Sequence, residues 1–368
     1  MLDRAKLLQQ LESQADNLFI DYSQEFSLAQ RVWHEIAQDP LFAHKIKAVN
    51  APWLLPGWSD TLDKTVAVGQ ANTQYTAFAV DGSQIYPDKH QGTTCYLINI
   101  GSVCIWYGQP KPVWLWSEPY VFVNEQQEFE CSPEELVNCR RQELELKIGL
   151  AQAQEKIQED GLFLFDGSLI FWHLEAKGPQ VKHRFLSCYL TLLSQFHTQK
   201  ILHAGYISLP KSKELANLVR VALCEFDCSR DEYKKIEHVN DATICKGFLQ
   251  EGERTIVFKH NSPLMQCYPE QLQPHFFYIH VGNEVGRVEI PAWIAQDEVL
   301  LEQVCATILD QCRKGNGYPV VLAESHEQAV IKGPDREFFY HLIAKFGFEN
   351  NKIMIRSQKS IKKRGIGI

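Results

Sequence analysis

Two aspartates in this sequence follow short apolar runs and precede the same dipeptide, Gly-Ser. Asp81 comes after residues 76–80 (TAFAV), and Asp166 comes after residues 162–165 (LFLF). A single Asp-Gly-Ser is ordinary turn chemistry, because Asp and Gly are common turn formers. If the two runs are neighbouring strands, however, their ends lie about 5 Å apart. Two carboxylates at about 4 Å repel each other by about 1 kcal/mol in water and by more in a sheltered cleft, and a divalent cation would remove that repulsion.

A third carboxylate comes from the segment between these aspartates. Residues 132–135 (SPEE) predict a capping box, with Pro at the first position of a helix that runs to about residue 158. At about 100° per residue, Glu143 falls inside the apolar stripe of this helix, and Glu145 lies about 160° away on a face expected to be solvated. An unpaired buried charge costs several kcal/mol, so we expect Glu143 to join the two aspartates. The alternative is that Glu143 pairs with a Lys or Arg at the rim of the core.

Carboxylates from two strand ends and one helix supply hard oxygen ligands, which Mg²⁺ and Mn²⁺ prefer. Two such ions a few ångström apart can bind a scissile phosphate, generate hydroxide from water and stabilise the leaving oxygen. A further candidate is His326, which follows residues 318–322 (YPVVL), a segment that predicts a short strand leading into a helix. A lone histidine is more often a satisfied structural residue.

The elements around these residues predict an α/β fold. Residues 1–38 have apolar positions at helical spacing and predict an N-terminal helical arm over residues 1–50, which the Pro-rich and Gly-rich stretch from Asn50 connects to the core. Runs at 76–80, 95–106 and 113–123 predict an antiparallel meander before the long helix and the buried strand 162–165. This order matches the opening of the ribonuclease-H-like fold, a mixed sheet flanked by helices. We expect this core over residues 74–346 and a basic tail over 347–368. Later helices are expected at 183–196, from 213, at 299–312 and from 324, with strands at 202–208, 276–290 and 318–322.

The overall charge limits how the protein can contact nucleic acid. A formal net charge of −8 argues against a surface that binds phosphates everywhere. The basic tail is the candidate for a local contact with nucleic acid, and the alternative is that it is only a solvated end of the chain. The cations of the tail are Lys352, Arg356, Lys359, Lys362, Lys363 and Arg364. The sequence has no apolar stretch of about 18 residues that could span a membrane, so we expect a cytoplasmic protein.

The eleven cysteines form no regular framework and are expected to be free, mostly buried thiols. The alternative is a zinc site with loose spacing, formed by Cys224, Cys228, His238 and Cys245.

Five segments in order resemble the NurA nuclease family. They are AVDGS at 79–83, ELEL at 143–146, FDGSL at 165–169, GYISLPKS at 205–212 and YPVVLAESH at 318–326. The resemblance covers residues 74–346. It implies a dimeric, Mn²⁺-dependent nuclease on a ribonuclease-H-like core, with Mg²⁺ as a possible substitute. Members of that family cut single-stranded and double-stranded DNA ends, as exonuclease and endonuclease, for end resection in recombinational repair with the hexameric HerA translocase.

The same resemblance implies roles for individual residues. The metal-binding acids fall on Asp81, Glu143 and Asp166, and the metal-site histidine falls on His326. A slip of two residues would bring Glu145 to the helix position instead. Tyr318 and Lys211 fall on positions near the substrate, where Lys211 would neutralise a phosphate. The implied mechanism has Asp81 bridging two metals, with His326 as a ligand or proton shuttle.

Two other classes of function stay open. One is a DNA-end adaptor that keeps the fold without turnover, and the other is a metal-dependent phosphatase or ribonuclease on a similar core. Digestion polarity, strand preference and dependence on the translocase do not follow from the residues.

Overall fold

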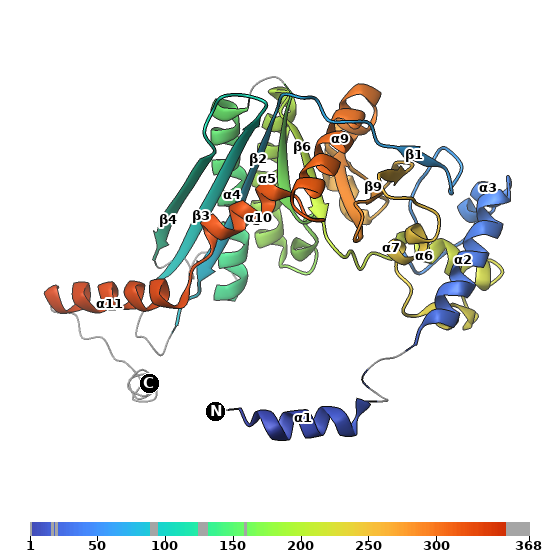
Figure 1. Ribbon diagram of the computed structural model, residues 1–368, viewed down its shortest axis with the longest axis horizontal. Helices are drawn as coiled ribbons and strands as arrows, with labels where there is room; N and C mark the ends of the chain where they lie inside the picture. Colours follow the sequence, from blue (N-terminus) through green and yellow to red (C-terminus); the bar gives the residue numbers. More distant parts are fainter. Residues whose placement is uncertain are drawn as a thin grey trace.

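The computed structural model describes residues 2–15, 18, 21–88, 95–123, 132–157 and 160–350. Its centre is a ten-stranded sheet of mixed direction with helices on both faces (Figure 1). The predicted fold class, a mixed α/β sheet flanked by helices, is confirmed. No helix in these ranges is long and apolar enough to cross a membrane.

The first half of the sheet contains the predicted order of three strands, a helix and a strand. Strands β2 (Tyr75–Ile85), β3 (Tyr96–Tyr107) and β4 (Trp114–Phe122) form the antiparallel meander. Helix α4 (Pro133–Lys156) begins with the predicted capping box at Ser132 and Glu135. Strand β5 (Gly161–Asp166) then pairs parallel to β2, and β6 (Leu202–Ile207) pairs parallel to β5 after α5 (Pro179–Thr198).

The second half of the sheet is antiparallel and continues from β6. Strand β10 (Val285–Pro291) pairs with β6 and with β9 (Pro274–His280), which also contacts the short strands β7 (Glu253–Thr255) and β8 (Phe258–Lys259). Strand β1 (Thr65–Ala67) closes this edge. The pair β9 and β10 is the predicted pair at 276–290. The strands β1, β7 and β8 are too short to give a periodic signal.

The sheet is buried on both faces, which explains the continuous apolar runs in β2 and β5. In β2, Phe78 and Val80 pack on one face with residues of α4 and α5, while Ala77 and Ala79 pack on the other. This second face is covered by α9 (Glu298–Lys314) and α10 (Val320–Ala329), in front of the sheet in Figure 1. Alternation along the strand therefore decides which helix each side chain meets.

The predicted N-terminal helices are present, but they differ in their packing. Helix α1 (Arg4–Ser13) has no buried residue and lies apart from the body in Figure 1. Helices α2 (Ser23–Gln38) and α3 (Phe42–Lys47) pack in an apolar cluster with α6 (Glu214–Leu223) and α7 (Asp241–Lys246). The remaining short elements are α8 (Ala292–Ala295) and 3-10 helices at Trp172–Leu174, Glu232–Ile236, Pro263–Cys267 and Glu270–Leu272.

Two local predictions are wrong. The segment expected as a strand at 318–322 is instead the approach to α10 and its first turn, with Pro319 as the N-cap residue. Its short apolar run suits a buried helix as well as a strand, because Val321 and Leu322 pack on the sheet. Asp81 was expected at a strand end, but β2 continues through Asp81-Gly82-Ser83 to Ile85 because β3 pairs with it over its whole length. The last helix is α11 (Gly333–Glu349), and the basic residues expected in the tail lie outside the described residues.

Candidate active site

The two aspartates lie on adjacent parallel strands. Pairing of β2 with β5 runs from Thr76 opposite Gly161 to Ala79 opposite Leu164, and the same register continued places Asp81 opposite Asp166. Burial, followed by the Asp81 charge, raises the pKa of the Asp166 carboxyl, and a hydrogen bond from Tyr318 opposes that rise. The pair therefore carries the repulsion that the sequence led us to expect.

The glutamate that meets this pair is Glu145. A β-carbon on residue 82 would lie 2.6 Å from Glu145 Oε1, so Gly82 leaves the space into which this carboxylate fits. Arg141 lies one turn earlier on α4; its Nη1 donates to the Gly82 carbonyl at 2.9 Å and its Nε lies 3.6 Å from Glu145 Oε1. The expectation of a solvated face at Glu145 is contradicted, since its side chain is only 18% exposed.

Glu145 is held in an environment that disfavours its charge. Burial is the largest cause and, with the charges of Asp81 and Asp166, raises the pKa of Glu145 to about 8, although Arg141 acts in the opposite direction. A carboxyl group surrounded by two other carboxyls in a sheltered position is the arrangement that a bound cation would relieve.

The structure does not bring Glu143 to the aspartates. Its carboxylate accepts from Arg140 at 2.6 Å and from Arg184 at 3.2 Å, and the Cys188 thiol donates to it at 3.3 Å. Burial raises the pKa of Glu143, but these hydrogen bonds and charges outweigh it and leave the pKa lowered. Glu143 faces a cleft of about 680 Å³ between α4 and α5. Glu143 therefore follows the alternative given above, in which it pairs with a basic residue at the rim of the core.

Helix α10 supplies His326 from the opposite side of the sheet. His326 Nδ1 lies 2.9 Å from Asp81 Oδ2, and its ring is 60% exposed. The helix can approach this closely because Gly101, the β3 partner of Asp81, has no side chain; a β-carbon there would lie 2.3 Å from the Ala329 nitrogen. His326 therefore reaches the solvent side of the acidic group.

Tyr318 precedes α10 and lies beside Asp166. Its hydroxyl donates to the Asp166 carboxylate, and burial followed by the Asp166 charge raises the pKa of Tyr318. Its ring packs against Tyr206, the β6 residue paired with Asp166, at 5.8 Å between ring centroids. The structure thus brings together Asp81, Asp166, His326 and Tyr318. Lys211 is exposed in the loop before α6 and makes no hydrogen bond or ion pair with the described acidic residues.

Each carboxylate of this group has its own protein partner. Asp81 is paired with His326, Asp166 with Tyr318 and Glu145 with Arg141. Accordingly, no three His, Cys, Asp or Glu side chains within the described ranges converge tightly enough, as they stand, to hold one ion. The chemistry of the donors nevertheless fits Mg²⁺ or Mn²⁺, because all three carboxylates offer hard oxygens and two have raised pKa values.

The zinc site considered from the sequence does not form among these residues. His238 Nδ1 lies 2.9 Å from Glu25 Oε1 and its ring stacks on Tyr22. Cys224 and Cys245 are buried, as a structural role for thiols requires, and the ten cysteines in the described part of the chain are free.

Comparison with known proteins places the chain in a family. A family model described as the NurA domain matches residues 75–331. The fold is similar to the NurA nuclease from Sulfolobus solfataricus, with a TM-score of 0.54, 14% identity and coverage of 95% of this chain and 98% of that one. It is also similar to a structure of NurA bound to dAMP and manganese, with a TM-score of 0.38, 10% identity and coverage of 90% and 94%. A search of curated proteins gave no match.

Proposed function

Because this chain belongs to the NurA family, we propose that it is a divalent-metal-dependent DNA nuclease whose metal ligands are Asp81, Glu145 and Asp166. One observation carries the proposal: two aspartates in register on parallel strands meet a glutamate that enters beneath Gly82. Glu145 takes the place expected for Glu143, which is neutralised by two arginines away from this group.

The protein side chains hold and orient the reacting groups. A metal bound here would supply a polarised phosphate and a hydroxide nucleophile at neutral pH. His326 keeps Asp81 in place through its Nδ1, and its exposed ring can carry a proton to the leaving oxygen. Tyr318 fixes the Asp166 carboxylate through its hydroxyl. Arg141 holds Glu145 and the Gly82 carbonyl together.

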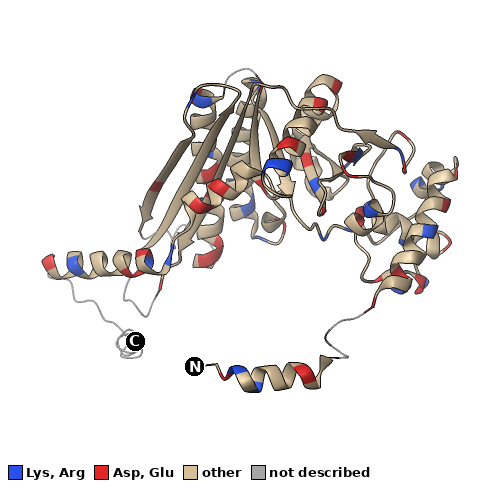
Figure 2. Ribbon diagram, viewed as in Figure 1, with Lys and Arg blue, Asp and Glu red and all other residues tan. Residues whose placement is uncertain are grey.

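The wider role follows the family. We propose Mn²⁺ as the metal, with Mg²⁺ as a substitute, and single-stranded and duplex DNA ends as the substrate. The setting is end resection in recombinational repair in the cytoplasm, by a homodimer working with a HerA-type translocase. Acidic and basic positions are interspersed over the described elements (Figure 2), which favours a local contact with DNA. Lys211, which is exposed in the loop before α6, would be one such contact.

Cleavage of an end-labelled linear DNA tests the proposal. The purified chain is incubated with Mn²⁺, Mg²⁺ or EDTA, and the products are resolved by length. Shortening with Mn²⁺ that stops in EDTA is the expected result. A small phosphate ester and an RNA of the same sequence serve as competing substrates, because preference for either would favour a phosphatase or a ribonuclease. Absence of cleavage with every metal, with and without the translocase, would favour a DNA-end adaptor.

A further inference from the structure

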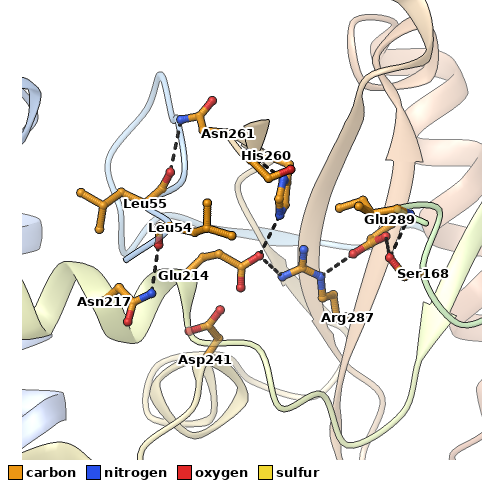
Figure 3. Close-up of polar contacts among 12 residues, drawn as sticks. Leu54, Leu55, Ser168, Glu214, Asn217, Asp241, His260, Asn261, Arg287 and Glu289 are labelled. Carbon is orange, nitrogen blue, oxygen red and sulfur yellow. Dashed lines mark hydrogen bonds and ion pairs between the residues drawn. The ribbon is translucent and has the colours of Figure 1, made fainter. Parts of the chain in front are cut away.

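A cavity opens on the chain immediately after Asp166, and the proposed reaction does not use it. Its volume is about 490 Å³, within the range of sites that hold small organic ligands. It is bounded by Trp53 of the N-terminal segment, Ser168 and Trp172 after β5, the start of α6, and β10. Figure 3 shows its polar residues converging from these elements.

The floor of the cavity is the guanidinium group of Arg287, which is 2% exposed. Its Nε donates to Glu289 Oε1 at 2.9 Å, and its Nη1 lies 3.0 Å from Glu214 Oε1 and 3.1 Å from the Tyr278 hydroxyl. Its Nη2 donates to no residue that the structure describes, and no dashed line reaches it in Figure 3. Because Arg287 lines the cavity, this donor is available to a ligand that brings an acceptor.

The cavity is tied to the catalytic group through the turn that follows Asp166. Glu289 Oε2 accepts from the Ser168 hydroxyl at 2.7 Å and from the Leu169 amide at 2.9 Å. The turn passes directly over β6 because Gly205 has no side chain; a β-carbon there would lie 2.3 Å from the Gly167 carbonyl oxygen. The wall of the cavity is therefore held at a fixed position relative to Asp166.

The mouth of the cavity combines aromatic rings with cations. Trp172 is 37% exposed, and Trp53 lines the cavity with the Arg220 guanidinium 5.9 Å from its ring. Arg220 is 9% exposed and its Nε has no hydrogen-bond partner among the described residues. Lys213 lies at the same mouth. Tryptophan faces and basic groups together are the features that bind single-stranded nucleic acid.

We infer that this cavity receives one unpaired nucleotide of the DNA strand adjacent to the scissile phosphate. The base stacks on Trp172 and Trp53, its edge accepts from Arg287 Nη2, and its phosphate lies beside Lys213 and Arg220. The inference rests on the proposed function, because it assumes that the strand is cut at Asp166. It assigns the buried group of Arg287, Glu214 and Glu289 a role in holding the strand end.

Binding of a fluorescent oligonucleotide in EDTA tests the inference without cleavage. Three single strands carry 2-aminopurine at the 5′ end, at the 3′ end or in the middle. We expect quenching for one of the two terminal probes and little for the internal one. Trp172→Ala should abolish that quenching and weaken binding about tenfold, and Trp172→Phe, which keeps a ring, should retain most of it. Phe338→Ala, which removes an exposed aromatic residue of α11, is the matched control.

Charge at the mouth gives a second readout. Lys213→Gln should lower the slope of log Kd against log salt by roughly 0.7, the contribution of one phosphate contact on a single strand. Lys345→Gln removes the same charge from α11, outside the cavity, and should leave the slope unchanged.

The outcomes separate this inference from the proposed function. If Trp172→Ala binds and quenches like the parent, or if the internal probe is quenched as strongly as the terminal ones, the inference fails even though the parent cleaves DNA. If terminal quenching depends on Trp172 while no metal supports cleavage, the cavity binds a nucleotide and the proposed catalysis fails. If the parent quenches no probe, the inference is overturned.

Discussion

The Glu145 carboxylate occupies the space that a β-carbon on residue 82 would fill, with 2.6 Å between that position and Oε1. Gly82→Ala should therefore displace the Glu145 carboxylate, together with the Arg141 stem, whose Cγ would lie 2.8 Å from the new β-carbon. A misplacement of about 1 Å at a catalytic group can cost about 10²-fold in rate. We expect a loss of that order in Mn²⁺-dependent cleavage, measured on an end-labelled duplex.

Gly69→Ala is the control for this substitution, because a β-carbon at residue 69 would meet nothing within 4 Å. It should cut DNA at the parent rate. Equal activity of the Gly82→Ala and Gly69→Ala variants would show that the position of Glu145 does not matter.

The two glutamates of α4 should respond differently to the loss of charge. Glu145→Gln removes a proposed metal ligand and should lower the cleavage rate by about 10² or more. Glu143→Gln removes ion pairs with Arg140 and Arg184 and should cost about 1 kcal/mol of stability while cleavage continues. Rates and urea midpoints of both variants check this, and the reverse pattern would return the ligand role to Glu143.

The raised pKa of Glu145 predicts how the stability of the metal-free protein depends on pH. Its pKa is about 8 in the folded chain against an ordinary value of 4.5, so the folded state keeps a proton that the unfolded state releases. This contribution is fully favourable below about pH 4.5 and is lost as the pH rises to about 8. In EDTA at pH 8, Glu145→Gln should therefore melt a few degrees above the parent.

At pH 5 the same two proteins should melt within about a degree of each other, since Glu145 is then protonated in the folded chain. Mn²⁺ added at pH 8 should raise the Tm of the parent more than that of Glu145→Gln. A Tm difference between the parent and Glu145→Gln that does not depend on pH would mean that the folded chain does not raise the pKa of Glu145.

The hydrogen bond from Tyr318 to Asp166 predicts a shift in the pH profile of cleavage. This bond favours the charged carboxylate, so Tyr318→Phe should raise the pKa of Asp166 further. The acidic limb of the rate against pH should move to higher pH, with a smaller loss on the alkaline side. Parallel profiles for the two proteins would show that the hydroxyl does not act on Asp166.

The sequence was sufficient to predict the aspartate pair but not the helix glutamate. Buried parallel strands have apolar runs whose ends can be matched, and this placed Asp81 and Asp166 together. An apolar stripe identifies one buried face of a helix, whereas α4 is covered on two sides, by β2 and by α5. Glu145 lies on the sheet side, in line with Arg141 and with Gly149, whose absent side chain lets the helix approach Phe163. Two features of the sequence could have indicated Glu145: an arginine, Arg141, stands four residues before it, and a glycine follows Asp81.

The cavity after Asp166 could not be predicted in the same way. Arg287 and Glu289 read as surface positions of an alternating strand, and only the crossing of α6 and of the turn after β5 makes them buried. Such contacts join residues more than 70 positions apart, beyond the reach of any local pattern.

The most direct test of the account is the rate of DNA cleavage by Asp81→Asn and Asp166→Asn in saturating Mn²⁺, each shown to fold by its circular dichroism and Tm. Both substitutions keep the shape of the side chain and remove one ligand charge. If Asp81 and Asp166 hold the metal, each substitution lowers the rate by about 10³ or more. Cleavage by both folded variants at the parent rate would contradict it.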